Sequence, residues 1–500
     1  MAHFPYTHLF LTSSIAVVIA GEHIQTLDVR TGSLISTTVG RDGSNAGPIR
    51  AAAIDSDGRH LVTVGDDKQL KVWRLDGLEL FNQRELPKRP TALGFTKNGD
   101  AILAADKFGD IFSYPLEYVP PTAPIEDKSA LYSSHENPSG GRLILGHVSL
   151  LNAFVLSDDE KYIITADRDE HVRVSWYPQG YTIESYCLGH TQFVSAIHIP
   201  CFAPDVLISG GGDPVLKVWD WLGGRFERDI PISDAVEPYI RVKPARKTPR
   251  RFGDQWDGRD DGKKGKKRRK GKGKSKGGAD ANEQPEPLSV IAAEEVEGLS
   301  VETQPDEDQK ILAISCIKSR GRDVLFSAYG ATALFSFTFP ESNSAPHICA
   351  LELEKPVLDF NVQDDGVIWI CVDGGWSPTG HESDRPGNMV RLAKIDAGAK
   401  LFEITAQPPP LLTALNSTTL LPATQSELTA LDLYGSLTAL PKGRDSEHDP
   451  MDREAIEGHT VELSKKELGR LKTKKAVAKQ QGNDDEEGRA DVEMTNVSST

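Results

Sequence analysis

A pattern of three short alternating strands, opened by Gly-His, recurs along this chain and constrains its fold more than any other feature. The clearest case is Gly146–Trp176, GHVSLLNAFVLSDDEKYIITADRDEHVRVSW, in which polar turns at Ser157–Asp159 and Asp167–Glu170 separate the apolar runs. Short β-type runs divided by polar turns are typical of one blade of a β-propeller. One such unit cannot bury both faces of its small sheet, so copies have to pack against one another. The pattern therefore predicts an all-β ring of repeated blades.

Further copies of this pattern lie on both sides of the central blade. They are Leu9–Arg30, Ile49–Trp73, Arg89–Tyr114, Gly189–Trp221, Lys310–Phe339, and Ala350–Trp376 continued by Met389–Ile404. We also expect Leu411–Leu440 to supply the last strands, which gives a seven-bladed WD-repeat β-propeller. An open ring would expose sheet edges, so we expect a strand at Leu9–Thr12 to join the strands near Leu431–Leu440.

Composition changes abruptly in two parts of the chain. Between residues 241 and 308 hydrophobic alternation is almost absent, and Lys263–Lys276 reads KKGKKRRKGKGKSK. Such a block repels itself and cannot form a core, which predicts a disordered basic insertion at 241–308. The propeller would then comprise residues 1–240 and 309–442. The charged tail, 443–500, is predicted to be disordered, except for a possible basic helix at Ser464–Gln480.

The motif content argues against chemistry by the chain itself. The five cysteines show no CxxC spacing, which favours a reducing compartment over a disulfide framework or a zinc site. We find no HExxH, GxSxG, phosphate-binding loop or dinucleotide fingerprint, so no catalytic residue and no metal site is predicted. The N-terminus lacks a basic leader region and is interpreted as strands, and no segment is long and apolar enough to span a membrane.

Repeated polar positions are better explained by blade structure than by function. Aspartates begin the turn before the third strand, where a carboxylate can accept backbone N–H bonds and can pair with the Gly-His imidazole. We expect a structural role for Asp67, Asp213, His147, His190 and Trp219. In the same alignment Asp169 takes the place of Asp67 and Asp213. Strand alternation puts Lys71, Arg173 and Lys217 on a face that we expect to be solvated.

The central blade departs from the template. Its turn carries two additional charges, Arg168 and Glu170, and it has His171 where the other blades have Gln or Val. Ser175 stands where two other blades have tryptophan. A high charge density beside a regular strand is typical of an edge that docks a partner, although a solvated turn explains it as well.

At these residues the sequence resembles the non-catalytic WD-repeat subunit of the tRNA (guanine-N7-)-methyltransferase. The segments that carry the resemblance are Lys88–Pro90, Ala105–Asp110 (ADKFGD), Leu145–Ser149, Ile164–Ser175 (with ADRDEHVRVS), Gly189–Ser195 and Ser209–Asp213. They lie within Lys88–Trp221, about a quarter of the chain, and the DKFGD and DRDEH strings are specific features.

The resemblance implies a propeller that binds a separate Rossmann-type methyltransferase subunit edge-on as a heterodimer. That partner would hold S-adenosylmethionine and methylate guanine N7 in tRNA, so this chain would need no cofactor and would meet tRNA through the complex. The implied interface comprises Arg168, Asp169, His171 and Arg173, with Lys107 as a further candidate. Arg173 would pair with an acidic residue of the partner. An Arg173→Glu change is therefore expected to weaken the pair without unfolding the propeller.

The basic run has three readings that composition does not separate. Its members are Lys263, Lys264, Lys266, Lys267, Arg268, Arg269 and Lys270. Such runs serve as nuclear localisation signals or contact phosphate backbones, and a solubilising spacer is the third reading. We expect the chain in the nucleus. The rival function is a generic WD-repeat scaffold, such as a ubiquitin-ligase substrate receptor or a ribosome-assembly factor. An enzyme that uses the central channel would need polar or metal-binding side chains there, for which the sequence gives no indication.

Overall fold

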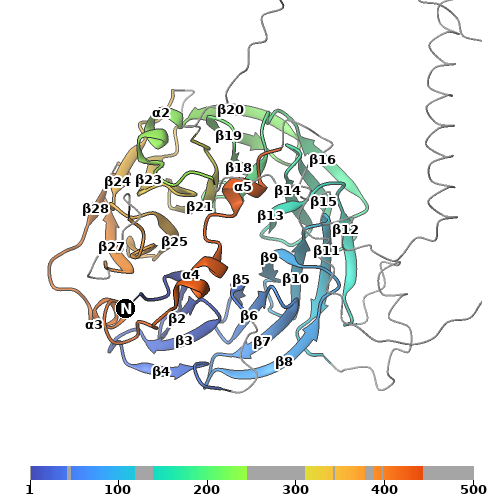
Figure 1. The fold of residues 1–500 in the computed structure, drawn as a ribbon. Coiled ribbons are helices and arrows are strands. Elements are labelled where there is room, and N and C mark those ends of the chain that lie inside the picture. Colours follow the sequence, from blue (N-terminus) through green and yellow to red (C-terminus); the bar gives the residue numbers. More distant parts are fainter. Residues whose placement is uncertain are drawn as a thin grey trace, which may run out of the picture. The chain divides into compact units, whose positions relative to one another are not determined.

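The computed structural model describes residues 2–41, 47–118, 139–244, 310–341, 344–377, 387–396 and 398–442 of the 500-residue chain. Within these ranges the strands form seven four-stranded sheets, and every sheet uses four strands consecutive in sequence. Figure 1 shows the sheets arranged as a ring, with the first strand of each sheet toward the centre and the fourth at the outside. The expected seven-bladed propeller is confirmed.

Each sheet is one blade, numbered here from 1 to 7 in chain order. The first four are blade 1, β1 (Tyr6–Leu11), β2 (Ile15–Ala20), β3 (His23–Asp28) and β4 (Leu34–Thr37); blade 2, β5 (Ile49–Ile54), β6 (His60–Gly65), β7 (Gln69–Arg74) and β8 (Glu79–Glu85); blade 3, β9 (Pro90–Phe95), β10 (Ala101–Asp106), β11 (Asp110–Pro115) and β12 (Arg142–Gly146); and blade 4, β13 (Leu151–Leu156), β14 (Tyr162–Asp167), β15 (Val172–Trp176) and β16 (Ile183–Cys187).

The remaining blades follow the same order. They are blade 5, β17 (Val194–His198), β18 (Val206–Gly211), β19 (Val215–Asp220) and β20 (Arg225–Pro231); blade 6, β21 (Ile314–Arg320), β22 (Asp323–Ala328), β23 (Ala333–Thr338) and β24 (Cys349–Glu352); and blade 7, β25 (Val357–Val362), β26 (Val367–Val372), β27 (Val390–Ile395) and β28 (Leu401–Glu403). The helices are α2 (Ser233–Val236), the 3-10 turn η1 (Glu237–Tyr239), α3 (Pro410–Leu415), α4 (Gln425–Leu431) and α5 (Ser436–Ala439).

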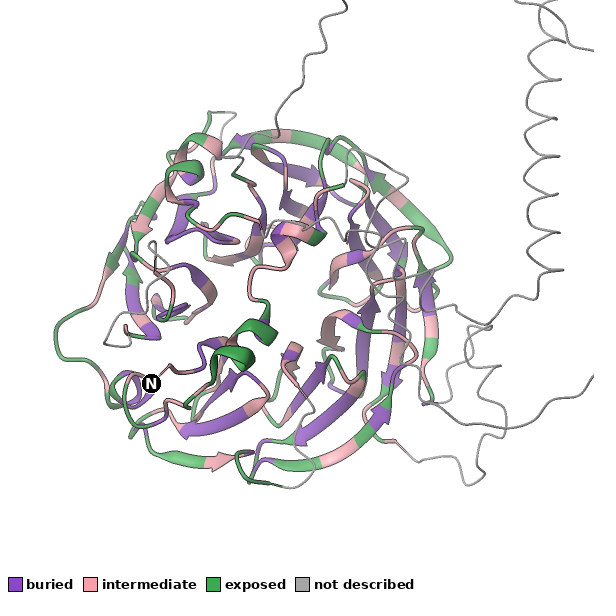
Figure 2. Ribbon diagram, in the orientation of Figure 1, coloured by how far each residue is buried: buried purple, intermediate pink, exposed green. Residues whose placement is uncertain are grey.

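Alternating side chains of a blade fill two different cores, one on each side of it. In blade 2, Leu61 and Trp73 pack with residues of blade 1 such as Ile19. Val62 and Leu70 pack instead with residues of blade 3. The two-residue period of a strand is thus what makes each blade apolar on both faces. Figure 2 shows the result, with buried residues concentrated in the middle strands and exposed residues on the outer ones.

The predicted closure of the ring is wrong. We expected β1 to pair with C-terminal strands, but β1 belongs to a sheet made entirely of residues 6–37. The ring closes instead by packing blade 1 against blade 7, where the amide of Leu9 donates to Asp359 Oδ2 at 3.0 Å. A single bridge between His3 and Pro422 adds to this seam. Apolar packing therefore closes the ring, and no sheet is shared between the two ends of the chain.

The segment Leu411–Leu440 also does not supply the last strands, as we expected it to. It contains α3, α4 and α5, while blade 7 is completed by residues up to Glu403. The start of α4 is fixed by a capping box, in which the Thr424 side chain accepts from the amide of Glu427 and the Glu427 carboxylate accepts from the amide of Thr424. Local capping outweighs the weak alternation that suggested strands.

Residues 425–442, named here the C-terminal strap, cross the face of the ring that carries the turns between second and third strands (Figure 1). Near its start, Arg50 of blade 2 donates to the carbonyl of Ala430 at 2.8 Å. Farther on, the Tyr434 hydroxyl donates to Asp373 of blade 7 at 2.8 Å, and Leu437 is buried in a small apolar cluster with Phe193 of blade 5. The strap therefore ties together blades that lie across the ring from one another.

The predicted insertion and tail lie almost wholly outside the described residues. Of the insertion, only 241–244 are described, and there the amide of Arg241 donates to Gly330 at 2.9 Å. The tail and its possible basic helix, 443–500, are not described. No helix in the described part of the chain is long and apolar enough to cross a membrane.

The contact between blades 5 and 6 makes a testable contribution to pH dependence. His198 lies 2.8 Å from the Ser319 hydroxyl, and burial, with Lys318 nearby, lowers the pKa of His198 to about 4. An unfolded histidine titrates near pH 6.5, so between these values the unfolded state binds more protons. The free energy of unfolding should therefore fall as the pH decreases from 6.5 to 4, by up to about 3 kcal/mol from this group.

The measurement compares the unaltered chain with His198→Gln by urea denaturation at pH 7 and pH 4.5. Glutamine does not titrate, so the loss in the variant should be smaller by about 2 kcal/mol. Only the difference between the two chains is informative, because Asp106, whose pKa burial raises to about 6, acts in the opposite direction. Equal losses in both chains would show that His198 does not carry the effect.

Candidate partner-docking rim

The charged turn of blade 4 joins β14 to β15 and is organised by Asp167. Oδ1 of Asp167 accepts the amides of Asp169 and His171 at 2.9 and 3.0 Å. Oδ2 lies 2.9 Å from Nδ1 of His147, whose Nε2 lies 2.8 Å from the Thr165 hydroxyl. Burial opposes ionisation of Asp167, but the hydrogen bond from His147 and the amide of His171 lower its pKa overall. The histidine of the Gly-His motif thus holds Asp167, and Asp167 in turn fixes the conformation of the turn.

The predicted pairing of the aligned turn aspartate with the Gly-His imidazole is wrong in this blade. In blade 5 the expected residue is used, because His190 Nδ1 lies 2.7 Å from Asp213 Oδ2. In blade 4 the imidazole pairs with Asp167, two residues before the aligned Asp169. Asp169 is therefore released from the structural role that the alignment gave it.

Asp169 and His171 lie at the surface, as a docking role requires. The side chain of Asp169 is 37% exposed and that of His171 is 50% exposed. The last residue of the strap, Lys442, lies 3.4 Å from Asp169 and donates to Glu170 at 2.9 Å. The acidic side of the turn is thus already paired within the chain.

Arg168 and Arg173 lie deeper than expected, and each is 8% exposed. Nη1 of Arg173 donates to the carbonyl of Gly146 at 2.9 Å, while its Nε has no hydrogen-bond partner. Lys71 and Lys217, at equivalent positions, are also buried, so the prediction of a solvated face is wrong for all three cations. A glutamate at 173 would bury a carboxylate beside that carbonyl, so Arg173→Glu should now also cost stability.

Lys107 lies in the corresponding turn of blade 3, between β10 and β11, and is half-buried. Its ammonium lies 5.5 Å from the ring centre of Phe108, and Lys88 lies 4.3 Å from the same ring. The DKFGD string thus has a local packing role in addition to any role in docking. The basic run Lys263–Lys270 lies outside the described residues.

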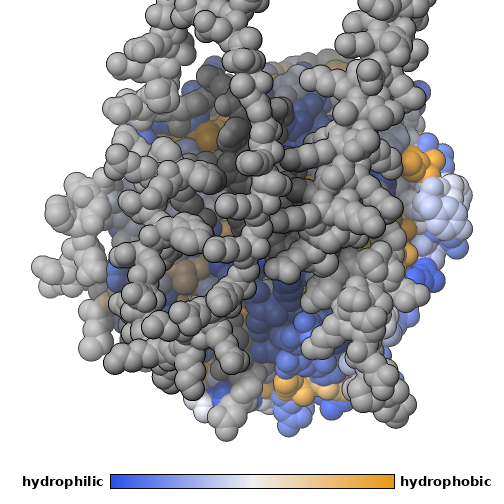
Figure 3. Space-filling view, turned by 45° about the vertical axis from the view of Figure 1, so that its right-hand side comes forward, coloured by the Kyte–Doolittle hydropathy of each residue, from blue (hydrophilic) through white to orange (hydrophobic). Residues whose placement is uncertain are grey.

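An apolar rim that the sequence pattern did not predict lies on the outer strands of blades 4 and 5. It consists of exposed large apolar side chains on β15, β16, β20 and the turns beside them: Trp176, Tyr181, Ile183, Tyr186, Leu188, Leu222 and Phe226. Tyr181 and Leu188 are 81% and 61% exposed. Figure 3 turns this side of the ring forward and shows hydrophobic residues among hydrophilic ones where grey atoms leave the edge in view.

The rim adjoins the charged turn through Tyr186. This residue pairs with Arg173 across β15 and β16, so the two side chains lie on the same face of the sheet. The Ser185 hydroxyl donates to the Trp221 carbonyl at 2.7 Å, which links the outer strand of blade 4 to blade 5. Exposed aromatic residues beside a charged cluster form the kind of surface that protein partners bind.

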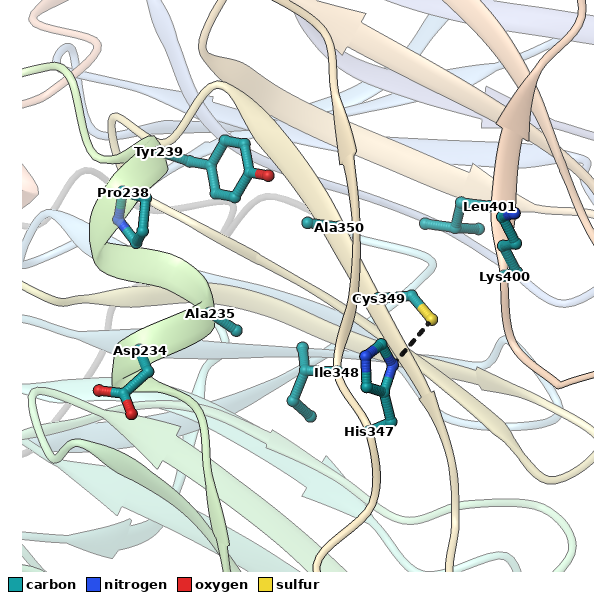
Figure 4. Close-up of a pocket in the computed structure, with 10 residues that line it drawn as sticks. All are labelled: Asp234, Ala235, Pro238, Tyr239, His347, Ile348, Cys349, Ala350, Lys400 and Leu401. Carbon is teal, nitrogen blue, oxygen red and sulfur yellow. Dashed lines mark hydrogen bonds between the residues drawn. The ribbon is translucent and has the colours of Figure 1, made fainter.

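Among the described residues, one hollow brings a cysteine and a histidine together, but the thiol is not activated for catalysis. A hollow of about 580 Å³ opens between α2, β24 and β28, and Figure 4 shows Cys349 and His347 pointing toward each other at its wall. Their Sγ and Nδ1 atoms lie 3.5 Å apart. Burial, and then the charge of Asp396, raise the pKa of the Cys349 thiol, so it is not an activated nucleophile. No group of His, Cys, Asp and Glu side chains among the described residues could hold a metal ion.

Comparison with protein families gives a match over most of the propeller. A family model described as the tRNA methyltransferase TRM82 WD40 domain matches residues 36–140 and 127–388. Similar curated proteins carry the name tRNA (guanine-N(7)-)-methyltransferase non-catalytic subunit. One from Aspergillus oryzae is 40% identical, over 35% of this chain and 45% of that protein. One from Meyerozyma guilliermondii is 38% identical, over 38% and 44%.

A relative from Bos taurus, named tRNA (guanine-N(7)-)-methyltransferase non-catalytic subunit WDR4, is 36% identical over 38% of this chain and 42% of that protein. The chain therefore spans less than half the length of the curated relatives that it matches. Among solved structures, one described as "Structure of U3-55K" has a TM-score of 0.51 at 14% identity, covering 79% of this chain and 97% of that one. At this identity the likeness shows the fold alone.

Proposed function

The chain belongs to the family described as the tRNA methyltransferase TRM82 WD40 domain, and on that premise we propose that it is a non-catalytic subunit that binds and stabilises the methyltransferase subunit forming N7-methylguanine in tRNA. The printed names of the curated relatives support this proposal, because each describes a non-catalytic subunit of that enzyme. A non-catalytic subunit implies a catalytic partner, and we propose a heterodimer that meets tRNA as a complex.

The observation that carries the docking site is the apolar rim beside the charged turn. Interfaces are enriched in aromatic residues at their centre and are polar at their margin. Tyr181, Tyr186 and Leu188 would supply the centre, and Asp169 and His171 the polar margin. We assign this surface to the catalytic methyltransferase subunit. The centre of the turn-carrying face is disfavoured as the docking surface because the C-terminal strap crosses it and ends at this charged turn, where Lys442 contacts Asp169 and Glu170.

The mechanism that we propose is a shift of the partner's conformational equilibrium. A rigid propeller that binds only the competent form of its partner stabilises that form by mass action. The partner would hold S-adenosylmethionine and the target guanine. The residues of the propeller would act by binding and orienting the partner, and the role of Arg173 would be to meet one of its carboxylates.

The test is co-expression with the catalytic methyltransferase subunit of the same organism, followed by tRNA methylation assays on each chain and on the pair. We expect activity from the pair, none from this chain and little from the partner alone. A partner that is fully active alone and does not co-purify would contradict the proposal. Co-purification of a ubiquitin-ligase adaptor or of ribosome-assembly factors instead would favour the generic scaffold.

The basic run Lys263–Lys270 is proposed to direct the chain to the nucleus. Replacing its seven Lys and Arg residues by glutamine should shift a fluorescent fusion of the full chain from nucleus to cytoplasm. In the purified pair, the salt dependence of tRNA binding should stay unchanged. A weaker salt dependence with unchanged localisation would instead assign the run to the phosphate backbone.

A further inference from the structure

The third strands of blades 2, 4 and 5 carry equivalent residues at two positions on one face. The first position holds a cation opposite a hydroxyl residue of the second strand: Lys71 opposite Thr63, Arg173 opposite Thr165, and Lys217 opposite Ser209. The second position, two residues later, holds Trp73, Ser175 and Trp219. At these two positions blade 4 differs from the other two in having arginine in place of lysine and serine in place of tryptophan.

In blade 5 the indole of Trp219 fills the space between the third strand and the Gly-His motif. Its Nε1 donates to the Ser209 hydroxyl at 2.8 Å, and the ring is completely buried. It also lies against Gly189, where an added Cβ would come within 3.3 Å of the ring. This space, bounded by the glycine before the histidine, is named here the tryptophan slot.

In blade 4 the tryptophan is missing but the slot is not left to solvent. Ser175 is completely buried, and its hydroxyl has no hydrogen-bond partner. The glycine equivalent to Gly189 is Gly146, and its carbonyl accepts from Nη1 of Arg173 at 2.9 Å. The guanidinium therefore contacts the carbonyl of the glycine that is equivalent to Gly189, while the Cβ side of Gly146 faces Asp110.

Arg173 also lacks the pairing that the other two cations have. Lys217 donates to Asp229 at 2.8 Å, and Lys71 lies 3.9 Å from Asp67. Opposite Arg173, β16 supplies Tyr186, and none of the ion pairs within the described residues includes Arg173. Its Nε has no partner, so the buried guanidinium lies near the Asp167 carboxylate but makes no ion pair with it.

We infer that Ser175 is a positioning residue: by leaving the tryptophan slot of blade 4 empty, it lets the Arg173 guanidinium rest there, beneath Tyr186, as a receptor for one carboxylate of a protein partner. A tryptophan at 175 would take the slot and displace the guanidinium. The link to a partner rests on the proposed function, whereas the occupancy of the slot is a property of this chain alone.

The occupancy is tested on the free full-length chain with phenylglyoxal, which modifies exposed arginines, followed by peptide mass spectrometry. Arg173 should react at least tenfold more slowly in the unaltered chain and in Ser175→Ala than in Ser175→Trp. Equal reactivity in all three chains would overturn the inference. Arg225, 79% exposed in its side chain, is the internal control and should react alike in each.

A double-mutant cycle keeps the test decisive if Ser175→Trp folds poorly. Arg173→Ala should lower the melting temperature of the unaltered chain by a few degrees, because it empties the slot. In the Ser175→Trp background the same change should leave the melting temperature unchanged or raise it, because guanidinium and indole then compete. Equal shifts in the two backgrounds would show that the two residues do not share a slot.

The partner assay separates this inference from the proposed function. Ser175→Trp should bind the catalytic methyltransferase subunit at least tenfold more weakly, and Ser175→Ala within twofold of the unaltered chain. The unaltered chain could fail to bind the subunit while Arg173 shows the expected difference in phenylglyoxal reactivity. The proposed function would then be wrong, but the inference that Arg173 occupies the tryptophan slot would remain supported. If Ser175→Trp binds normally with Arg173 displaced, the docking role of the slot is wrong.

Discussion

Trp219→Ala is expected to lower the free energy of unfolding of the propeller by about 3–5 kcal/mol, the cost of emptying a fully buried tryptophan site. Trp219 is the end of a buried chain of hydrogen bonds: its indole donates to Ser209, Ser209 bonds His190, and His190 bonds Asp213. Its ring also contacts Phe226 at a centroid distance of 5.6 Å. The substitution thus removes packing and leaves a polar network with one partner fewer.

Urea denaturation of the full-length chain, followed by circular dichroism, measures this effect. Trp176→Ala is the matched control, because it deletes the same side chain at a position that is 38% exposed, and it should cost only about 1 kcal/mol. The denaturant midpoint of Trp219→Ala should fall with an unchanged slope. Equal losses in the two variants would mean that the buried network contributes little beyond apolar area.

The second large effect concerns binding. Replacing Tyr181 and Leu188 by alanine together is expected to weaken the pair with the catalytic subunit at least about 30-fold, since truncation of two central interface residues costs 2 kcal/mol or more. Both side chains are largely exposed in the free chain, so the fold should be unaffected. Isothermal titration or surface plasmon resonance with the purified partner gives the affinity.

The control for this double variant lies elsewhere on the ring. Leu80 on the outer strand of blade 2 and Phe402 on that of blade 7 are 42% and 44% exposed. Replacing both by alanine removes an aromatic and a leucine from outer strands far from the rim, and affinity should stay within twofold. A loss of affinity shared by both double variants would show that the rim is not the docking surface.

The ring could be predicted from sequence because its signal is repeated. Alternation places Leu70 and Val72, and likewise Leu216 and Val218, between blades, and the structure agrees, whereas Lys71 and Lys217 on the other side of these strands are buried against expectation. The pairing of His190 with Asp213 followed from the same repeat. The strand pattern of one blade is weak evidence by itself, but its recurrence along the chain makes the prediction of a propeller strong.

Two of the errors arose where local hydrogen bonds decide the structure against the hydrophobic pattern or the repeat. Leu411–Leu440 contains apolar residues that fit a strand as well as a helix, and the deciding signal was the local Thr424-x-x-Glu427 cap. In blade 4 the switch from Asp169 to Asp167 depends on where the imidazole reaches, which spacing alone does not give. Local hydrogen bonding decided both cases.

The candidate site was predictable only in its charged half. Asp169 and His171 lie at the surface, but Arg173, like Lys71 and Lys217, is buried on a face that strand alternation predicted to be solvated. The rim residues were missed because apolar side chains on an outer strand are read as strand formers. The apolar outward positions of Ile183 and Tyr186 in a fourth strand, together with Tyr181 in the turn before it, were the signal that could have revealed the rim.

The seam between the ends of the chain has a consequence for synthesis on the ribosome. The amide of Phe4 donates to the carbonyl of Leu421, and Tyr6 is buried against residues from Trp369 onward. At roughly 5–20 residues per second, about 20–80 s separate the emergence of the two sides of this seam. Throughout that interval the apolar face of blade 1 that later packs against blade 7 remains uncovered. The nascent chain should therefore be most open to chaperone capture through its earliest strands, and release should coincide with translation of the residues around 421.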